Sequence, residues 1–222
     1  MKIRTTEQLV EAVAAEIAWR RRELTDLWFL LEHTDGNRTH QTVLTRAAVA
    51  LLYAHWEGFV KATAEIYLEF VAMQRCQNSE LADNMLAIAV RSKLFAAQTS
   101  RRIARHSTVV EFFRTQMERR SALPYKDAIR TEANLSSTVL MEILCTLGLS
   151  TVPYEPKRHL IDSQLLAKRN HIAHGSVLNV ESDDYLALHD EVLGLMCLLR
   201  NQVENAAVGR EYLRPTVPAA PA

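Results

Sequence analysis

The strongest constraint on the fold is a long stripe of helix-spaced residues that begins after residue 41. Most members of the stripe are three, four or seven positions apart: Leu44, Ala48, Leu51, Leu52, His55, Phe59, Ile66 and Phe70. The 222 residues include only six glycines, and no run of useful length alternates polar with apolar residues. The sequence therefore predicts an all-α chain, with a central core helix that starts near Gln41.

Start and stop signals predict further helices around this one. Thr5 and Gln8 form a capping pattern before an apolar stripe that runs from Leu9 to Leu31. Later in the chain, residues that favour helix starts and ends predict four more helices: a third capped by Asn78 and Ser79, a fourth capped by Ser107 and ended by Leu123-Pro124, a fifth between Ser136 and Gly148, and a last one capped by Ser182 or Asp183. Pro153 and Pro156 predict an extended passage between the fifth helix and the next segment.

Together these elements predict a helical up-and-down bundle with a helical insert before residues 158–174. We expect residues 1–212 to form a single domain and residues 213–222 to form a disordered tail, because the tail has little to bury. Three widely spaced cysteines, Cys76, Cys145 and Cys197, predict buried free thiols in a reducing compartment. No signal core and no run of 18 apolar residues is present, so we expect a cytoplasmic protein without a membrane partner.

Charge is polarised along the sequence, although 26 basic residues balance 26 acidic ones. Residues 91–130 hold ten basic and three acidic side chains, and residues 181–211 hold two basic and seven acidic ones. The basic region is typical either of an RNA-phosphate surface or of an ordinary solvated helix face. Within the first helix, Arg20, Arg21 and Arg22 favour a solvated face.

The segment Lys168-Arg169-Asn170-His171-Ile172-Ala173-His174-Gly175 gathers several polar side chains at the end of a predicted helix. That helix runs without proline from residue 158 to residue 174, and Gly175 predicts a left-handed stop at its end. On such a helix Asn170 and His174 lie on the same side. Arg169 and His174 lie about 140° apart around the axis, so a second copy of the helix would bring Arg169 of one chain toward His174 of the other.

These residue types suit phosphodiester cleavage without a metal. The carbonyl groups at a helix end attract a charged imidazole, and a charged His174 can donate a proton to a leaving oxygen. Arg169 offers a planar pair of donors for phosphate oxygens, and the Asn170 amide can orient the scissile group. A single histidine near a helix end is more often a capping or surface residue. The hypothesis of phosphodiester cleavage therefore rests on Arg169, Asn170 and His174 together.

At this point the sequence resembles a known family. Arg169-Asn170-x-x-x-His174 resembles the Arg-x4-6-His motif of the HEPN superfamily of all-helical ribonucleases, in the form found in the bacterial MAE-type (RiboL-PSP-like) branch. A second block, from Leu51 to Lys61 (LLYAHWEGFVK), resembles the long second helix of that branch. The two blocks lie more than a hundred residues apart and extend from the second helix to the last third of the chain.

The resemblance implies a homodimer with a composite cleft and a metal-independent endoribonuclease, a toxin or phage-defence nuclease that leaves a cyclic phosphate. It implies RNA as the substrate, no cofactor, and an antitoxin or another defence-system protein as a further partner. We expect Arg169, Asn170 and His174 to be catalytic. We expect five further residues to bind RNA: Lys168, His171, Arg101, Arg102 and Arg105.

Two alternatives remain open on the sequence alone. A metallohydrolase would use His171 and His174 with His159 or His55, although no carboxylate has the customary spacing from these histidines. A non-catalytic HEPN module would instead bind RNA, a nucleotide or a partner protein. His55 itself lies on an apolar helix face, which favours a hydrogen-bonded core residue or a residue that supports the cleft from behind.

Overall fold

A computed structural model describes residues 2–34, 38–126, 128–132, 134–176 and 181–215. Within these ranges the regular elements are helices, and two isolated bridges pair single residues of neighbouring segments. The predicted all-α fold is confirmed. In the same ranges, no helix is both long and apolar enough to cross a membrane.

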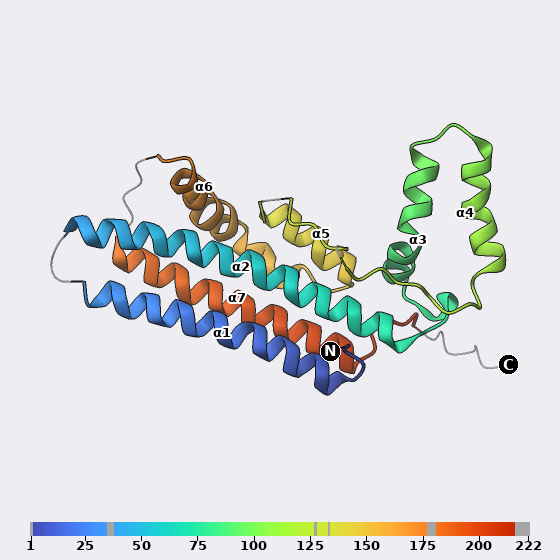
Figure 1. Ribbon diagram of the computed structural model, residues 1–222, viewed down its shortest axis with the longest axis horizontal. Helices are drawn as coiled ribbons and strands as arrows, with labels where there is room; N and C mark the ends of the chain where they lie inside the picture. The colour runs from blue at the N-terminus through green and yellow to red at the C-terminus, as the bar shows by residue number, and fades with distance from the viewer. Residues whose placement is uncertain (1, 35–37, 127, 133, 177–180, 216–222) are drawn as a thin grey trace.

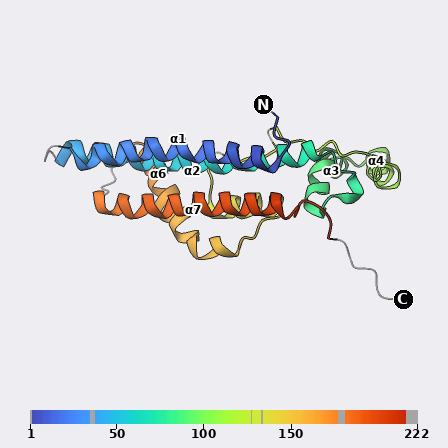
Figure 2. The ribbon, with the colours of Figure 1, turned by 90° about the horizontal axis from the view of Figure 1, so that it is seen from below.

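Three long helices form the core bundle: α1 (Thr6–Glu32), α2 (Arg38–Gln74) and α7 (Ser182–Val208). Helix α1 runs antiparallel to α2, whereas α7 runs in the same direction as α2, because the intervening chain returns to the start of α2 (Figure 1). Figure 2 shows α1 and α2 in one layer with α7 beneath them. The remaining helices lie beside α2 or beyond the end of the bundle.

Helix α2 is the centre of the core, as the apolar stripe predicts. It starts three residues before Gln41 and buries side chains on several sides, including Trp56, Phe59 and Tyr67, which are fully buried. Helix α1 starts with the predicted capping box, in which the Thr5 hydroxyl accepts from the Gln8 N–H and the Gln8 side chain accepts from the Thr5 N–H. For both helices, the positions predicted from the sequence agree with the residues that are buried in the structure.

Arg20 corrects the expectation of a solvated arginine face on α1. Its side chain is buried, stacks over Trp19 with 4.3 Å between the guanidinium carbon and the ring centre, and pairs with Glu16. A Cβ atom added to Gly58 of α2 would lie 3.2 Å from the Arg20 guanidinium. The absence of a side chain at Gly58 therefore makes room for Arg20.

Helices α3 (Asp83–Gln98) and α4 (Ile103–Thr115) form a hairpin that projects beyond the end of the bundle (Figure 1). Two expected helix starts are wrong here. Asn78 and Ser79 lie in a short 3-10 helix, η1 (Asn78–Glu80), where the Asn78 amide donates to the Gln116 carbonyl just after α4 instead of capping α3. Ser107 lies inside α4, which starts at Ile103.

Helix α5 (Ser137–Leu147) starts at a Ser136 cap and stops at a left-handed Gly148, as predicted. The passage that follows is not extended but forms a 3-10 helix, η2 (Val152–Lys157). Proline is compatible with this turn, because its fixed φ is a helical one and the first residues of a helix need no donor. The last helix, α7, has Glu181 at its N-cap, just before the expected Ser182.

The helical run predicted for residues 158–174 is present, with one irregularity. Its middle is a π-helical segment, η3 (Leu160–Leu166), which continues directly into α6 (Ala167–Ala173). Ile161 and Leu165 are fully buried and fix this run against the bundle, where α6 packs on α2. The π segment comes before the motif, so the spacing from Arg169 to His174 stays that of an α-helix.

The cysteines differ from the prediction. All three are free thiols, but Cys145 is exposed, and Cys76 and Cys197 are only half-buried. Most of the expected tail and the extended link at residues 177–180 lie outside the described residues.

Candidate functional site

The end of α6 is built by a two-bond stop that leaves His174 on the surface. The Ser176 N–H donates to the His171 carbonyl over 2.9 Å, and the Gly175 N–H donates to the Ile172 carbonyl over 3.1 Å. Gly175 has a φ of 72°, the left-handed conformation that this Schellman motif needs. The predicted glycine stop is therefore confirmed, and the imidazole of His174 is exposed beside it.

Arg169 is held from two sides. Its guanidinium carbon lies 4.1 Å from the centre of the Tyr53 ring, and its Nη2 donates to Asn134 Oδ1 over 3.0 Å. The ring comes from α2 and the amide from the segment before α5. This combination of stacking and hydrogen bonding fixes the direction of the half-buried guanidinium at the junction of α6, α2 and that segment.

Tyr53 also anchors the segment before α5. Its hydroxyl accepts from the Leu135 N–H over 2.6 Å. Burial raises the pKa of Tyr53, and a hydrogen bond with Arg169 partly opposes this shift. The phenol is therefore neutral at physiological pH and serves as a fixed platform and acceptor.

Sequence reasoning overlooked both Tyr53 and Asn134 as site residues. Tyr53 lies within the block that resembles the HEPN second helix, and that was its only signal. Asn134 lies in an irregular segment, 35 residues before Arg169, and no spacing pattern marks it.

A third contact ties the start of α5 to the motif run. Asp162 Oδ1 of η3 accepts from the Ser137 N–H over 2.7 Å, and its Oδ2 accepts from the Ser137 hydroxyl over 2.6 Å. Within residues 134–137, Asn134 therefore bonds to α6, Leu135 to α2 and Ser137 to η3. The geometry around Arg169 therefore depends on three segments that are distant in sequence.

The other expected site residues on α6 form a surface around its end. Lys168 and Asn170 are half-buried, and His171 and His174 are exposed. The His174 N–H, at the C-cap, still donates to the Asn170 carbonyl over 3.0 Å, so His174 lies around the helix from Arg169 much as the sequence predicted. Because Arg169 points toward Tyr53, the motif of one chain presents an exposed imidazole and a clamped guanidinium on different sides of α6.

The expected RNA-binding residues outside α6 lie elsewhere on the molecule. Arg101 and Arg102 are in the turn between α3 and α4, Arg105 is in the first turn of α4, and all three are exposed. Figures 1 and 2 place this turn at the far end of the molecule from α6. One chain therefore does not bring these arginines next to the motif.

His55 faces α1 and not the motif. Its Nε2 lies 3.0 Å from Glu23 Oε2, and its ring meets Trp19 edge-on at 5.2 Å. Burial lowers the pKa of His55, although the nearby Glu23 carboxylate partly opposes the shift. Within the described part of the chain, no three histidine, cysteine or acidic side chains gather as a metal site would require.

Comparison with protein families identifies the family of this chain. A model of the HEPN_MAE_28990-like HEPN family matches residues 9–212. The chain belongs to this HEPN family. The match extends from the first turns of α1 to the segment after α7, so it includes the bundle, the α3–α4 hairpin and the motif of this HEPN chain. Searches among curated proteins and among solved structures found no significant match.

Proposed function

We propose that this HEPN protein is a metal-independent endoribonuclease. The observation that carries the proposal is the exposed end of α6, where His174 follows Arg169 and Asn170 at motif spacing in a chain of the HEPN family. In this proposal Arg169 binds the phosphate, Asn170 orients it, and His174 moves the proton. Lys168 and His171 contact the RNA around them.

The ribose 2′-hydroxyl supplies the nucleophile. Its oxygen attacks the adjacent phosphorus and loses its proton, the bond from phosphorus to the 5′-oxygen breaks, and that oxygen takes up a proton. The products are a 2′,3′-cyclic phosphate and a free 5′-hydroxyl. A histidine can serve either proton transfer, and an arginine stabilises the charge that develops on the phosphate oxygens.

A second copy of the chain completes the site in this proposal. Arg169 is directed toward Tyr53 and Asn134, whereas His174 is exposed at the helix end. A two-fold crossing of two α6 helices would place His174 of one protomer near Arg169 of its partner. In this proposal the protein is therefore a homodimer. We also propose that it acts in the cytoplasm as a toxin or defence nuclease, with an antitoxin or another defence-system protein as a further partner.

The direct test is RNA cleavage by purified protein in the presence of EDTA. We expect cleavage by the wild type and loss of cleavage for His174→Ala. His159→Ala is the matched control, because His159 is also exposed on the same helical run and belongs to the metal-dependent alternative. Cleavage by His174→Ala at the wild-type rate would refute the assignment, and dependence of the wild type on added metal would favour the alternative.

One observation favours a second candidate, a HEPN module that binds RNA or another partner without cutting it. The Arg169 guanidinium already stacks on Tyr53 and donates to Asn134, contacts that a purely structural arginine would also make. RNA binding that is sensitive to salt, without cyclic-phosphate products, would support this candidate.

A further inference from the structure

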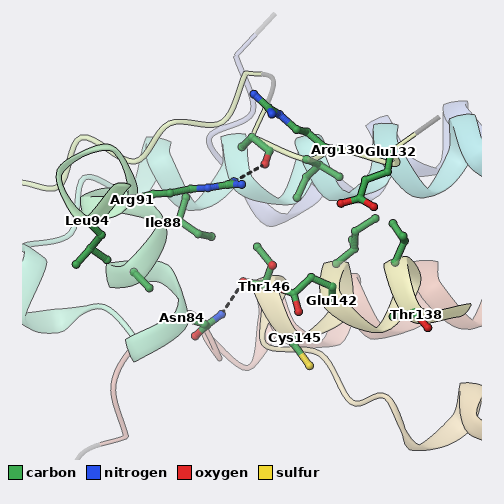
Figure 3. Close-up of a pocket in the computed structure, with 15 residues that line it drawn as sticks. Asn84, Ile88, Arg91, Leu94, Arg130, Glu132, Thr138, Glu142, Cys145 and Thr146 are labelled. Atoms are coloured by element: carbon green, nitrogen blue, oxygen red, sulfur yellow. Dashed lines mark hydrogen bonds between the residues drawn. The ribbon is translucent and has the colours of Figure 1, made fainter. Parts of the chain in front are cut away.

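A cavity of about 660 Å³ opens between α3, α5 and the segment at residues 128–132 (Figure 3). Its size is in the range of small-molecule sites. Two hydrogen bonds connect its facing walls. The Asn84 amide donates to the Thr146 carbonyl over 3.0 Å, and Arg91 Nη1 donates to the Ala128 carbonyl over 3.1 Å. The cavity is therefore held between elements that are fixed to each other.

The Asn84 bridge depends on Gly148. A Cβ atom at Gly148 would lie 2.9 Å from the Asn84 amide nitrogen, and its φ of 75° also favours glycine. Gly148 thus both ends α5 and leaves room for the hydrogen bond from Asn84 to Thr146 across the cavity.

The lining combines an apolar floor with a charged rim. Ile88 of α3 and Ile143 of α5 line the cavity and are buried, at 6% and 4% exposure. Figure 3 shows Arg91 extending from α3 above Ile88, Glu142 on α5, and Glu132 on the segment at residues 128–132, across from α5. Glu132 has a φ of 53°, a conformation that non-glycine residues rarely adopt and that is enriched at binding sites.

We propose that this cavity binds one nucleotide of the RNA, an inference that rests on the proposed function. The apolar floor suits the face of a base, and Arg91 supplies positive charge for its phosphate. The carboxylates of Glu132 and Glu142 offer only acceptor oxygens, so they bind bases that present amino groups. Uracil presents two carbonyl oxygens and one N–H at its Watson–Crick edge but no amino group. The cavity therefore binds adenine, cytosine or guanine in preference to uracil.

The cavity and the motif share one segment of the chain. Residues 128–132 form a wall of the cavity, and Asn134, two residues later, binds Arg169. Helix α5 lies between α6 and the α3–α4 hairpin on the same side of α2 (Figure 1). A strand of RNA bound in the cavity would therefore approach the motif region along α5.

The test measures binding in a His174→Ala background, in which RNA stays intact. The probes are fluorescent oligoribonucleotides of A, C, G or U and the four nucleoside monophosphates. Ala87→Trp fills the cavity from an exposed position of α3, and Ala15→Trp is the matched control on the exposed side of α1. Thermal unfolding checks that both variants fold.

We expect the parent protein to bind A, C and G oligomers more tightly than U. Ala87→Trp should weaken binding of the amino-bearing oligomers by about tenfold, which is the size of one lost base contact. Ala15→Trp should leave it unchanged. Glu132→Gln with Glu142→Gln should reduce the preference over U, because an amide can also donate to the uracil carbonyls.

Three other outcomes would overturn all or part of the cavity proposal. Unchanged affinity and base preference in folded Ala87→Trp would overturn the cavity proposal and leave the nuclease proposal intact, since cleavage is measured separately. Binding of monophosphates but not oligomers, lost in Ala87→Trp, would make the cavity a free-nucleotide site and overturn its role for RNA. Binding of neither probe would overturn the nucleotide site altogether.

Discussion

At the scale of single residues, Arg169 is defined as much by its neighbours as by its place in the motif. The Tyr53 ring supports the guanidinium plane, and Asn134 sets its direction. The Tyr53 hydroxyl also accepts from the buried Leu135 N–H. One tyrosine thus connects the motif to the segment that carries Asn134.

Tyr53→Phe should lower the free energy of unfolding by about 1–3 kcal/mol, because the Leu135 N–H would be left buried without its acceptor. The ring under Arg169 remains, so the arginine keeps its stacking contact. Urea unfolding measures the change. Tyr125→Phe, a half-buried tyrosine outside the site, is the control and should change stability less. Equal effects of the two substitutions would argue against the importance of the Leu135 bond.

His55 should make stability depend on pH. Its folded-state pKa lies below the ordinary value of 6.5, so below that pH the unfolded chain binds more protons than the folded one. The free energy of unfolding should be highest above about pH 6.5 and should fall as the pH is lowered toward 5. Urea unfolding at both ends of this range should show a smaller fall for His55→Gln than for the wild type. A fall of the same size in both proteins would exclude His55 as the cause.

At the scale of elements, the stop of α6 depends on backbone conformation alone. Gly175 has a positive φ, and nothing lies within 4 Å of a Cβ atom placed there. Gly194, inside α7, has the same open space without a positive φ. Because neither site is crowded, a comparison of the two glycines isolates the effect of a positive φ on stability.

Gly175→Ala should destabilise the protein by about 1–2 kcal/mol, the cost of a left-handed conformation for alanine. Gly194→Ala should stabilise it by about 0.5–1 kcal/mol, because alanine loses less backbone entropy in a helix. Thermal unfolding of the two variants should give shifts of opposite sign. Shifts of the same sign would show that the helix stop is not governed by φ.

The elements also show where sequence reasoning succeeds. Where a capping side chain and an apolar stripe coincide, as at Thr5 before α1 and Ser136 before α5, helix starts were predicted correctly. The hairpin was predicted less well, because α4 buries only Phe112 and so has little apolar pattern to mark its ends. Asn78 had the right residue type for a cap, but a carbonyl 38 residues away binds its amide.

At the scale of the whole molecule, the proposed site divides its residues between two chains. A mixture of Arg169→Ala and His174→Ala proteins tests this division. If each site takes Arg169 from one protomer and His174 from the other, mixed dimers contain one intact site, and about a quarter of wild-type activity should return after subunit exchange. Sites made within one chain would give no recovery. Each variant assayed alone is the control.

The hairpin arginines should contribute to RNA affinity through charge alone. Replacing Arg101, Arg102 and Arg105 by glutamine should reduce the slope of log affinity against log salt by about 2, since each contact with a single-strand phosphate contributes about 0.7. Fluorescence anisotropy in the His174→Ala background measures the slope. The same replacement of Arg4, Arg21 and Arg22, exposed on or before α1, should leave it unchanged.

The candidate site was only partly predictable for a physical reason. The order Arg169, Asn170, His174 and the Gly175 stop are local, so helix geometry and residue type reveal them. The contacts of Arg169 with Tyr53 and Asn134 join positions 116 and 35 residues apart, and no local pattern encodes such pairs. Burial of Arg20 against Trp19 was missed for a related reason, because a run of three arginines resembles a solvated face.

Cys145 gives the native chain a position for a spectroscopic label. It is the exposed member of the three cysteines and lies in the wall of the cavity, whereas Cys76 is half-buried and burial raises the pKa of its thiol. Thiol reagents react with accessible thiolates, so a maleimide dye should attach first at Cys145. Quenching or a spectral shift of that dye would then report occupancy of the neighbouring space in real time, without any engineered residue.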